Sequence, residues 1–135
     1  KASYLLTILK NIIGYKEKRC TINLGGQIWQ RDCFMISIAN GKRFGGGFYV
    51  TPNALVTDGL LDVNIVAKIA PLKRLRYLPV IGKGKHLSLP FIIYKQCRNA
   101  NIEFASGIHA HMDGEYFFAQ TFDVTVLPKR FSFLV

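Results

Sequence analysis

The chain has 135 residues, of which 50% are hydrophobic, and a formal net charge of +10. A chain of this length closes one ordinary hydrophobic core, so we expect residues 1–135 to form a single domain. Its apolar residues come in short runs. None approaches the roughly 20 uninterrupted residues that cross a bilayer, which excludes a membrane-spanning segment and predicts a soluble protein. The excess of positive charge favours anionic partners such as nucleic acid, nucleotide phosphate or an acidic membrane.

The cysteines indicate the cellular compartment of the protein, and the first residue indicates that the sequence is part of a longer chain. Cys20, Cys33 and Cys97 are an odd number without the spacing of metal ligands. We interpret them as reduced thiols, which predicts a cytoplasmic protein. The sequence begins at Lys1 with neither an initiator methionine nor an export signal, so we expect it to be part of a longer protein.

The N-terminal part of the chain predicts one helix followed by a hairpin. Apolar residues recur at helical spacing over residues 4–12, and Gly14 follows as a stop. This pattern predicts an amphipathic helix of about three turns. Residues 20–24 and 28–38 then have the composition of strands, and the Gly25-Gly26 pair between them favours a tight turn.

The remainder predicts a β-rich fold with one more helix. Residues 61–66 largely alternate between apolar and polar side chains, as a half-buried strand does. Pro71 then opens a short helix near residues 71–80, with basic residues on its outer face. Further strands are predicted at 48–50, 91–97, 101–105, 108–112, 116–118, 122–127 and 131–134. Many short strands with close turns indicate a mainly β domain, an antiparallel β-sandwich of barrel-like form.

The acidic residues are scarce and unevenly placed. There are only eight Asp and Glu, and half of them lie in two segments that each contain an Asp-Gly pair, namely Asp58, Asp62, Asp113 and Glu115. In the first segment, the glycines at 45–47 permit close approach of the backbone, and the turn at Asp58 presents a carboxylate beside free carbonyls. Carboxylate and carbonyl oxygens are what Mg²⁺ or Ca²⁺ requires. The alternative is that Asp58 caps its own turn.

The second segment, Asp113-Gly114-Glu115, lies between two apolar strands. Two carboxylates at the rim of a sheet can act as general base or cation ligand in phosphoryl transfer. The alternative is a surface hairpin turn with a solvated Glu115. His109 and His111 precede this turn and share one face of a strand. No third ligand is in view, so a plain strand is favoured over a metal pair.

Taken in order, these segments comprise a Gly-Gly-Gly strand, a Pro-Asn-Ala loop, Asp-Gly-Leu-Leu-Asp-Val at 58–63, and Asp-Gly-Glu at 113–115. This order resembles the C-terminal domain of the diacylglycerol kinase family, which includes sphingosine kinases and bacterial lipid kinases. The resemblance runs from Ile22 to the C-terminus. It implies an ATP-dependent enzyme of two domains that transfers phosphate to a diacylglycerol-like or sphingoid hydroxyl in the cleft between them.

The resemblance also implies what is absent. The family's nucleotide segment, Gly-Gly-Asp-Gly-Thr, does not occur in this sequence. The N-terminal nucleotide-binding domain is therefore expected elsewhere in the same protein, and this piece alone is expected to be inactive.

Residue by residue, Glu115 matches the family's proton acceptor for the lipid hydroxyl, and Asp113 is expected to support it or to contact Mg²⁺. The structural Mg²⁺ of bacterial members maps to the side chain of Asp58 and to backbone oxygens of Leu55 and Leu60. Where many members have a second acid before the Asp-Gly pair, this chain has a threonine.

A basic stretch surrounds the helix predicted near 71–80 and consists of Lys68, Lys73, Arg74, Arg76, Lys83 and Lys85. In the plain interpretation it is a solvated face. A lipid kinase must reach its substrate at a membrane, so we favour peripheral contact of this stretch with anionic lipid headgroups.

Two other functions compete with the lipid kinase. A basic β-barrel that binds nucleic acid would suit the charge and the 13% aromatic content. Here, however, the basic residues cluster in loops and one helix. Trp29 and the phenylalanines fall in alternating strands typical of a core, so we expect no nucleic-acid partner. A structural module that pairs through exposed sheet edges is the third possibility, and it leaves a homodimer open.

Overall fold

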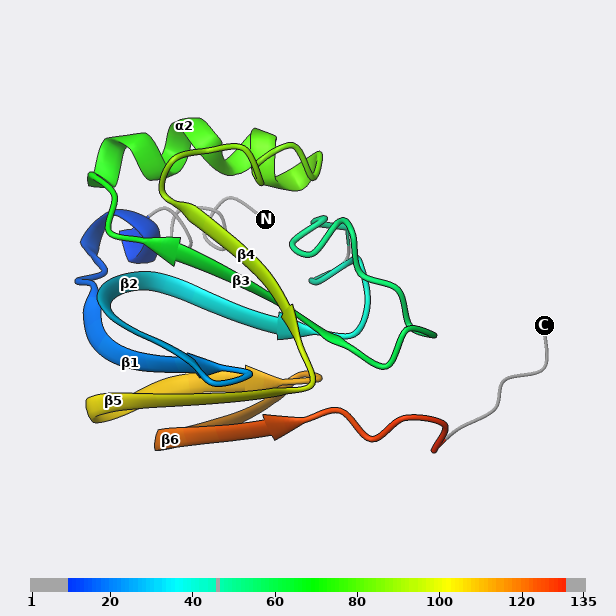
Figure 1. Cartoon of the computed structure of the whole chain (residues 1–135). Helices are drawn as coiled ribbons and strands as arrows, with labels where there is room; N and C mark the ends of the chain where they lie inside the picture. The colour runs from blue at the N-terminus through cyan, green and yellow to red at the C-terminus, as the bar shows by residue number, and fades with distance from the viewer. Residues whose placement is uncertain (1–9, 46, 131–135) are drawn as a thin grey trace.

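The computed structural model describes residues 10–45 and 47–130, which form one antiparallel sheet of six strands (Figure 1). The strands are β1 (Lys18–Leu24), β2 (Gln27–Ala39), β3 (Leu61–Ala67), β4 (Ile92–Cys97), β5 (Asn99–Met112) and β6 (Glu115–Thr125). Their order across the sheet is β4-β3-β2-β1-β5-β6. Helix α2 (Pro71–Gly82) follows β3, and residues 10–14 are helical.

The predicted fold class is confirmed, with one refinement. The protein is mainly β and antiparallel, with a helix at the position predicted near 71–80. In the part of the chain that the structure describes, edge strands β4 and β6 do not pair with each other, so the sheet is not closed into a barrel. The helix predicted at 4–12 overlaps the described residues only at its end, and the strand predicted at 131–134 lies outside them.

A glycine turn sets the register of the first hairpin. Gly25 and Gly26 have φ values of 56° and 93°, the left-handed conformation that a two-residue hairpin turn needs. The side-chain oxygen of Asn23 accepts a hydrogen bond from the Gly26 N–H at 3.0 Å. The turn pairs Leu24 with Gln27, and the register continues to Lys18 opposite Cys33.

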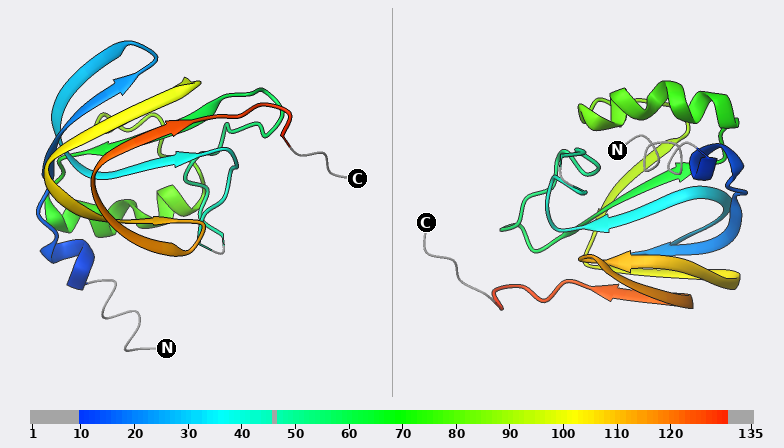
Figure 2. Two further views of the ribbon diagram at one scale, coloured as in Figure 1. Left: turned by 90° about the horizontal axis from the view of Figure 1, so that it is seen from below. Right: turned by 180° about the vertical axis from the view of Figure 1, so that it is seen from behind.

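Strands β5 and β6 bend back together, as both views in Figure 2 show. Their pairing shifts register between Glu103 and Ile108. At Gly107 in this bend, an added Cβ would lie 2.4 Å from Cε1 of Phe118, so a larger residue would have to displace this exposed ring. The predicted pairs of short strands are thus halves of two long, bent strands. The folded-back halves give the domain its sandwich-like form.

The hydrophobic core occupies both faces of the sheet. The main core contains Ile22, Val63, Ile65 and Ile102, and Ile108 of the folded-back hairpin packs against it. A second core lies under α2, where Tyr77 and Phe91 pack against Val66, Ile69 and Ile92. Helix α2 and the bent hairpin therefore cover opposite faces of the sheet (Figure 1).

Double coverage corrects one prediction. Strand β3 was expected to be half-buried, but every residue from Leu61 to Val66 is buried. Its polar members, Asp62 and Asn64, face the side that α2 and the loops before β3 and β4 enclose, and they are buried too. The alternation is real, but both rows of side chains lie inside the protein.

Candidate functional site

The turn before β3 places Asp58 at the surface. The Asp58 N–H donates to the Leu55 carbonyl at 3.4 Å, and the side-chain oxygen Oδ1 of Asp58 accepts from the Leu60 N–H at 2.9 Å. Gly59 has φ of 70°, as such a turn requires. Asp58 thus caps its own turn, and its carboxylate stays accessible to solvent.

A magnesium ion at this turn would have few protein ligands. Among the described residues, no group of three or more His, Cys, Asp or Glu side chains is placed to hold a metal ion. A cation here would take the Asp58 carboxylate, the backbone oxygens of Leu55 and Leu60, and water. This donor set fits Mg²⁺, which binds oxygen and keeps several waters of its own.

Behind this turn, β3 carries a buried carboxylate that we did not predict as a site residue. Asp62 is fully buried, and its Oδ1 accepts hydrogen bonds from the Tyr94 hydroxyl and from Nε2 of Gln96, the latter at 3.1 Å. Its second oxygen has no hydrogen-bond partner among the described residues. Burial raises the pKa of Tyr94 well above its ordinary value, and the hydrogen bond to Asp62 raises it further. An Asp inside an apolar strand was the sequence signal, because buried carboxylates require partners.

The β5–β6 turn carries the other predicted acids. Asp113 and Gly114 have φ values of 50° and 94°, again a two-residue left-handed turn, and Glu115 pairs with Met112. The next pair on the same face of the ribbon is Ala110 with Phe117, and both are half-buried. Glu115 therefore lies on the inner face of the folded-back hairpin, with its carboxylate exposed at the tip.

The two histidines before this turn share the opposite, exposed face. His109 pairs with Phe118 and His111 with Tyr116, as alternation predicts. The Nδ1 atom of His109 lies 2.7 Å from the Tyr116 hydroxyl, and the two rings are stacked. These contacts with aromatic residues agree with the plain strand interpretation of the pair.

The two acidic turns lie toward the same end of the molecule but in different layers (Figures 1 and 2). No hydrogen bond or ion pair joins Asp58 to Glu115 within the described part of the chain. The roles predicted for Glu115, Asp113, Asp58, Leu55 and Leu60 remain predictions.

An apolar pocket lies between α2 and the sheet, and nothing in the sequence pattern pointed to it. Its volume is about 230 Å³. The lining is apolar apart from one arginine and comes from five segments, namely Ile12, Phe34, Met35, Phe44, Phe48, Val50, Val66, Ile69, Arg74, Tyr77, Leu78, Ile81 and Phe91. A second hollow of about 290 Å³ between β1, β2, β5 and β6 is more polar. Glu115 lines neither of them.

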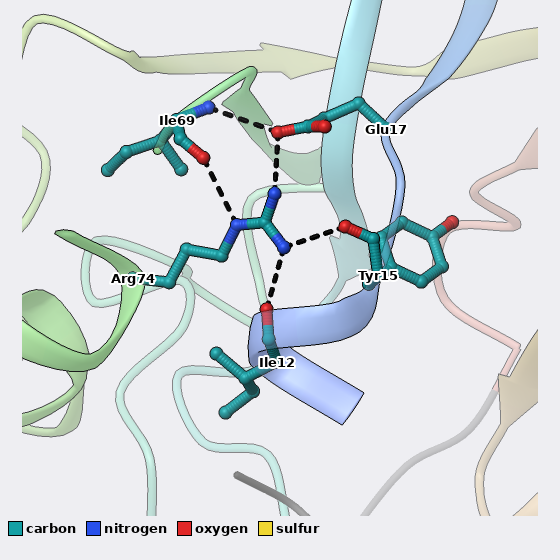
Figure 3. A network of polar contacts seen from close by, with 5 residues as sticks. All are labelled: Ile12, Tyr15, Glu17, Ile69 and Arg74. Carbon is teal, nitrogen blue, oxygen red and sulfur yellow. Dashed lines mark hydrogen bonds and ion pairs between the residues drawn. The ribbon is translucent and has the colours of Figure 1, made fainter. Parts of the chain in front are cut away.

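The prediction that Arg74 belongs to a solvent-facing basic surface is wrong, because its side chain points into the protein (Figure 3). Its guanidinium donates to the carbonyls of Ile69, Ile12 and Tyr15 at 3.1, 2.6 and 2.8 Å, and it forms an ion pair with Glu17 at 2.7 Å. It also lies over the ring of Phe34. Desolvation raises the pKa of Glu17, but hydrogen bonds from its own N–H and that of Ile69, together with Arg74, outweigh this and lower it.

A buried histidine holds the loop after α2. His86 is fully buried, and its Nε2 lies 3.0 Å from Nδ2 of Asn64 and 3.1 Å from the Val50 carbonyl. Asn64 also donates to that carbonyl, at 2.9 Å. Desolvation lowers the pKa of His86, although its contact with Val50 opposes the shift. This network ties β3 to the loops on either side of the pocket.

Comparison with known proteins finds a similarity that covers the whole sequence. The model of the YegS C-terminal NAD kinase beta sandwich-like domain matches residues 1–135. The chain belongs to this family. Among curated relatives of this YegS-type domain, a "Probable lipid kinase YegS-like" of Enterobacter sp. (strain 638) is 32% identical over 96% of the chain and 42% of its own length. A "Diacylglycerol kinase" of Mycobacterium tuberculosis is 28% identical over 76% of the chain and 33% of its own length.

Solved structures support the same fold for this YegS-type domain. A crystal structure of a diacylglycerol kinase from Bacillus anthracis str. Sterne superposes with a TM-score of 0.67 and 18% identity, over 90% of this chain and 44% of that one. The predicted resemblance to the C-terminal domain of the diacylglycerol kinase family is confirmed. The YegS-type domain spans less than half the length of these relatives. None of the described helices is long and apolar enough to cross a membrane.

Replacing Arg74 by Gln should destabilise the YegS-type domain by about 3–5 kcal/mol, because it removes a buried charge and leaves Glu17 unpaired. Arg76→Gln is the matched control, since Arg76 lies on the same helix with its side chain exposed, and should change stability by less than about 0.5 kcal/mol. Urea denaturation of the two variants measures both. Equal stabilities would show that the Arg74 contacts do not hold the fold.

The free energy of unfolding should fall as pH is lowered from neutrality through about 6.5, because His86 in the unfolded chain then takes up a proton that the folded protein resists. Thermal melts across this range measure the slope. The slope should disappear in His86→Gln and persist in the exposed-histidine variant His109→Gln/His111→Gln. An unchanged slope in His86→Gln would contradict this assignment.

Proposed function

We propose that this domain is the lipid-side half of an ATP-dependent lipid kinase, which transfers the γ-phosphate of ATP to the hydroxyl of a diacylglycerol-like or sphingoid lipid. The observation that carries the proposal is an apolar pocket beneath α2, in a domain whose curated relatives have lipid kinase names. The other half, with the nucleotide site, would belong to the same protein, and this domain alone would be inactive.

The pocket has the chemistry of a site for an acyl or sphingoid chain. Its one charged lining residue is Arg74, whose guanidinium is committed to backbone carbonyls and Glu17. The remaining surface offers a ligand almost no hydrogen bonds, which disfavours a polar ligand. At about 230 Å³ it is smaller than the roughly 300–1,000 Å³ of typical ligand pockets. It therefore suits a segment of a chain better than a whole lipid.

Glu115 is our candidate for the residue that accepts the proton of the lipid hydroxyl. A general base must reach its substrate, and this carboxylate is exposed at the tip of the folded-back hairpin, on the inner face of the ribbon. Asp113, on the same turn, would support it or contact the metal. The tip is positioned by only two strands, so we expect the missing domain to complete the cavity around it.

Magnesium would be the resident cation, held by the Asp58 carboxylate with backbone oxygens of Leu55 and Leu60. Bound at this turn, Mg²⁺ would be structural and would hold the turn before β3. Mg²⁺ contacted by Asp113 would instead neutralise charge that develops on phosphate oxygens. Asp62 would act indirectly, since its hydrogen bonds to Tyr94 and Gln96 fix the start of β3, from which this turn emerges.

In the full-length protein, Glu115→Gln should lower lipid-dependent turnover by about 10²–10⁴-fold, the usual contribution of a general base, with the KM for ATP unchanged. Glu103→Gln provides a control with the same chemical change at another exposed glutamate of the hairpin strands, and it should keep normal activity. Transfer of labelled phosphate to diacylglycerol measures both. Ordinary turnover of Glu115→Gln would remove this residue from the mechanism.

Filling the pocket should block acyl-chain binding. Ile81 lines the pocket and its neighbour Val80 does not. Ile81→Trp should therefore weaken binding of a fluorescent fatty acid such as cis-parinaric acid, while Val80→Trp should not. Equal binding by the two variants would place the fatty acid elsewhere on the protein.

A further inference from the structure

One long stretch of the chain contains no acidic residue. From Val63 to Ile102 there is no Asp or Glu, whereas eight basic residues occur, namely Lys68, Lys73, Arg74, Arg76, Lys83, Lys85, Lys95 and Arg98. Arg74 is neutralised inside the protein by Glu17. The other seven are exposed, and within the described residues none of them has a carboxylate in ion-pair range. Their charge is therefore available to a partner.

Two of these seven basic residues lie on the outer face of α2. Leu72, Arg76, Pro79 and Lys83 follow one another at spacings of four, three and four residues, which places them on one side of the helix, and all are exposed. Arg74 points from the opposite side into the protein. The outer stripe thus combines bases with an apolar residue, Leu72, whose exposure reaches 78%.

The same helix forms the roof of the apolar pocket. Leu78 and Ile81 of α2 line the pocket, as do Phe44 and Phe48 of the loop after β2. These phenylalanines are unusually exposed, at 63% and 46%. The ring of Phe48 also lies beside the end of α2, where a Cβ added to Gly82 would be 3.7 Å from it. The exposed ring of Phe48 therefore lies beside the end of α2 at which the basic stripe finishes with Lys83.

We propose that the outer face of α2, together with Phe44 and Phe48, docks on a bilayer that contains anionic lipids. We call these residues the α2 docking surface, and they comprise Phe44, Phe48, Leu72, Arg76 and Lys83. Bases attract anionic headgroups, and aromatic rings partition into the interface between headgroups and acyl chains. One part of this inference rests on the proposed lipid kinase function. In that part, docking gives the acyl chain of the substrate an apolar path from the bilayer to the pocket.

Vesicle binding tests the proposal without kinase activity. The protein is sedimented with phosphatidylcholine vesicles that either contain or lack phosphatidylglycerol. We expect binding only to the anionic vesicles, and weaker binding as salt rises. Arg76→Gln/Lys83→Gln should lower the affinity by about 25-fold, because each basic residue near an anionic surface contributes a factor of about five.

The matched control removes the same charge elsewhere in the acid-free stretch. Lys95 pairs with Val63 of the main core and so lies on the sheet face opposite α2. Lys95→Gln/Arg98→Gln should bind the anionic vesicles as the wild type does. An equal loss in both double variants would mean attraction by net charge alone, and it would overturn the docking surface.

Two further outcomes separate the partners and the functions. Phe48→Ser changes no charge, so it should weaken the part of the vesicle binding that remains at high salt. If Arg76→Gln/Lys83→Gln lost affinity for a single-stranded oligonucleotide but kept its affinity for vesicles, the partner would be nucleic acid and the proposal would fail.

Glu115→Gln should bind vesicles normally. If the full-length protein is an active lipid kinase but does not bind anionic vesicles, the docking surface is wrong and the proposed function stands. If it binds the vesicles but has no kinase activity, the proposed function is wrong and the docking surface stands.

Discussion

Removing a charged guanidinium from water costs free energy, so Arg74 can be buried only where hydrogen-bond acceptors are held in place for it. Those acceptors come from Ile69 just before α2 and from the segment before β1, more than fifty residues away in sequence. One side chain thus fixes how α2 lies over the sheet and where the N-terminal segment runs. Ile12 and Ile69, whose carbonyls it binds, are also pocket walls. The cavity therefore owes its shape to a polar interaction.

Local chemistry was enough to predict the turns. Gly25-Gly26 and Asp113-Gly114 adopt left-handed conformations that few other residue pairs reach easily, so the hairpins could be placed from sequence. Burial was harder. The polar side chains of β3 indicated a solvent-facing row, but Asp62 has hydrogen-bond partners on β4, which no alternation pattern reveals. Arg74 was assigned to the helix surface for the same reason, since a basic residue is normally exposed unless a distant segment provides for it.

The candidate site divides along a similar line. The sequence predicted the acids because carboxylates are rare in this chain and stand beside glycines. It could not predict the pocket, which is assembled from residues of five separate segments and has no motif. Nor could it show how the acids relate to one another, since Asp58 precedes a central strand and Glu115 begins an edge strand. In the proposed kinase, their relation would depend on a part of the protein outside the length that the relatives share with this domain.

The bend at Gly107 divides β5 into two parts with different support. Residues 100–104 pair with β1, but beyond the bend β5 pairs only with β6. The tip of the ribbon is thus anchored at one end only, and two-stranded ribbons have little stability of their own. Its reach can change in evolution without disturbing the sheet. Residues gained in pairs, one on each strand, would extend the ribbon, and each such step turns the terminal acid to the other face.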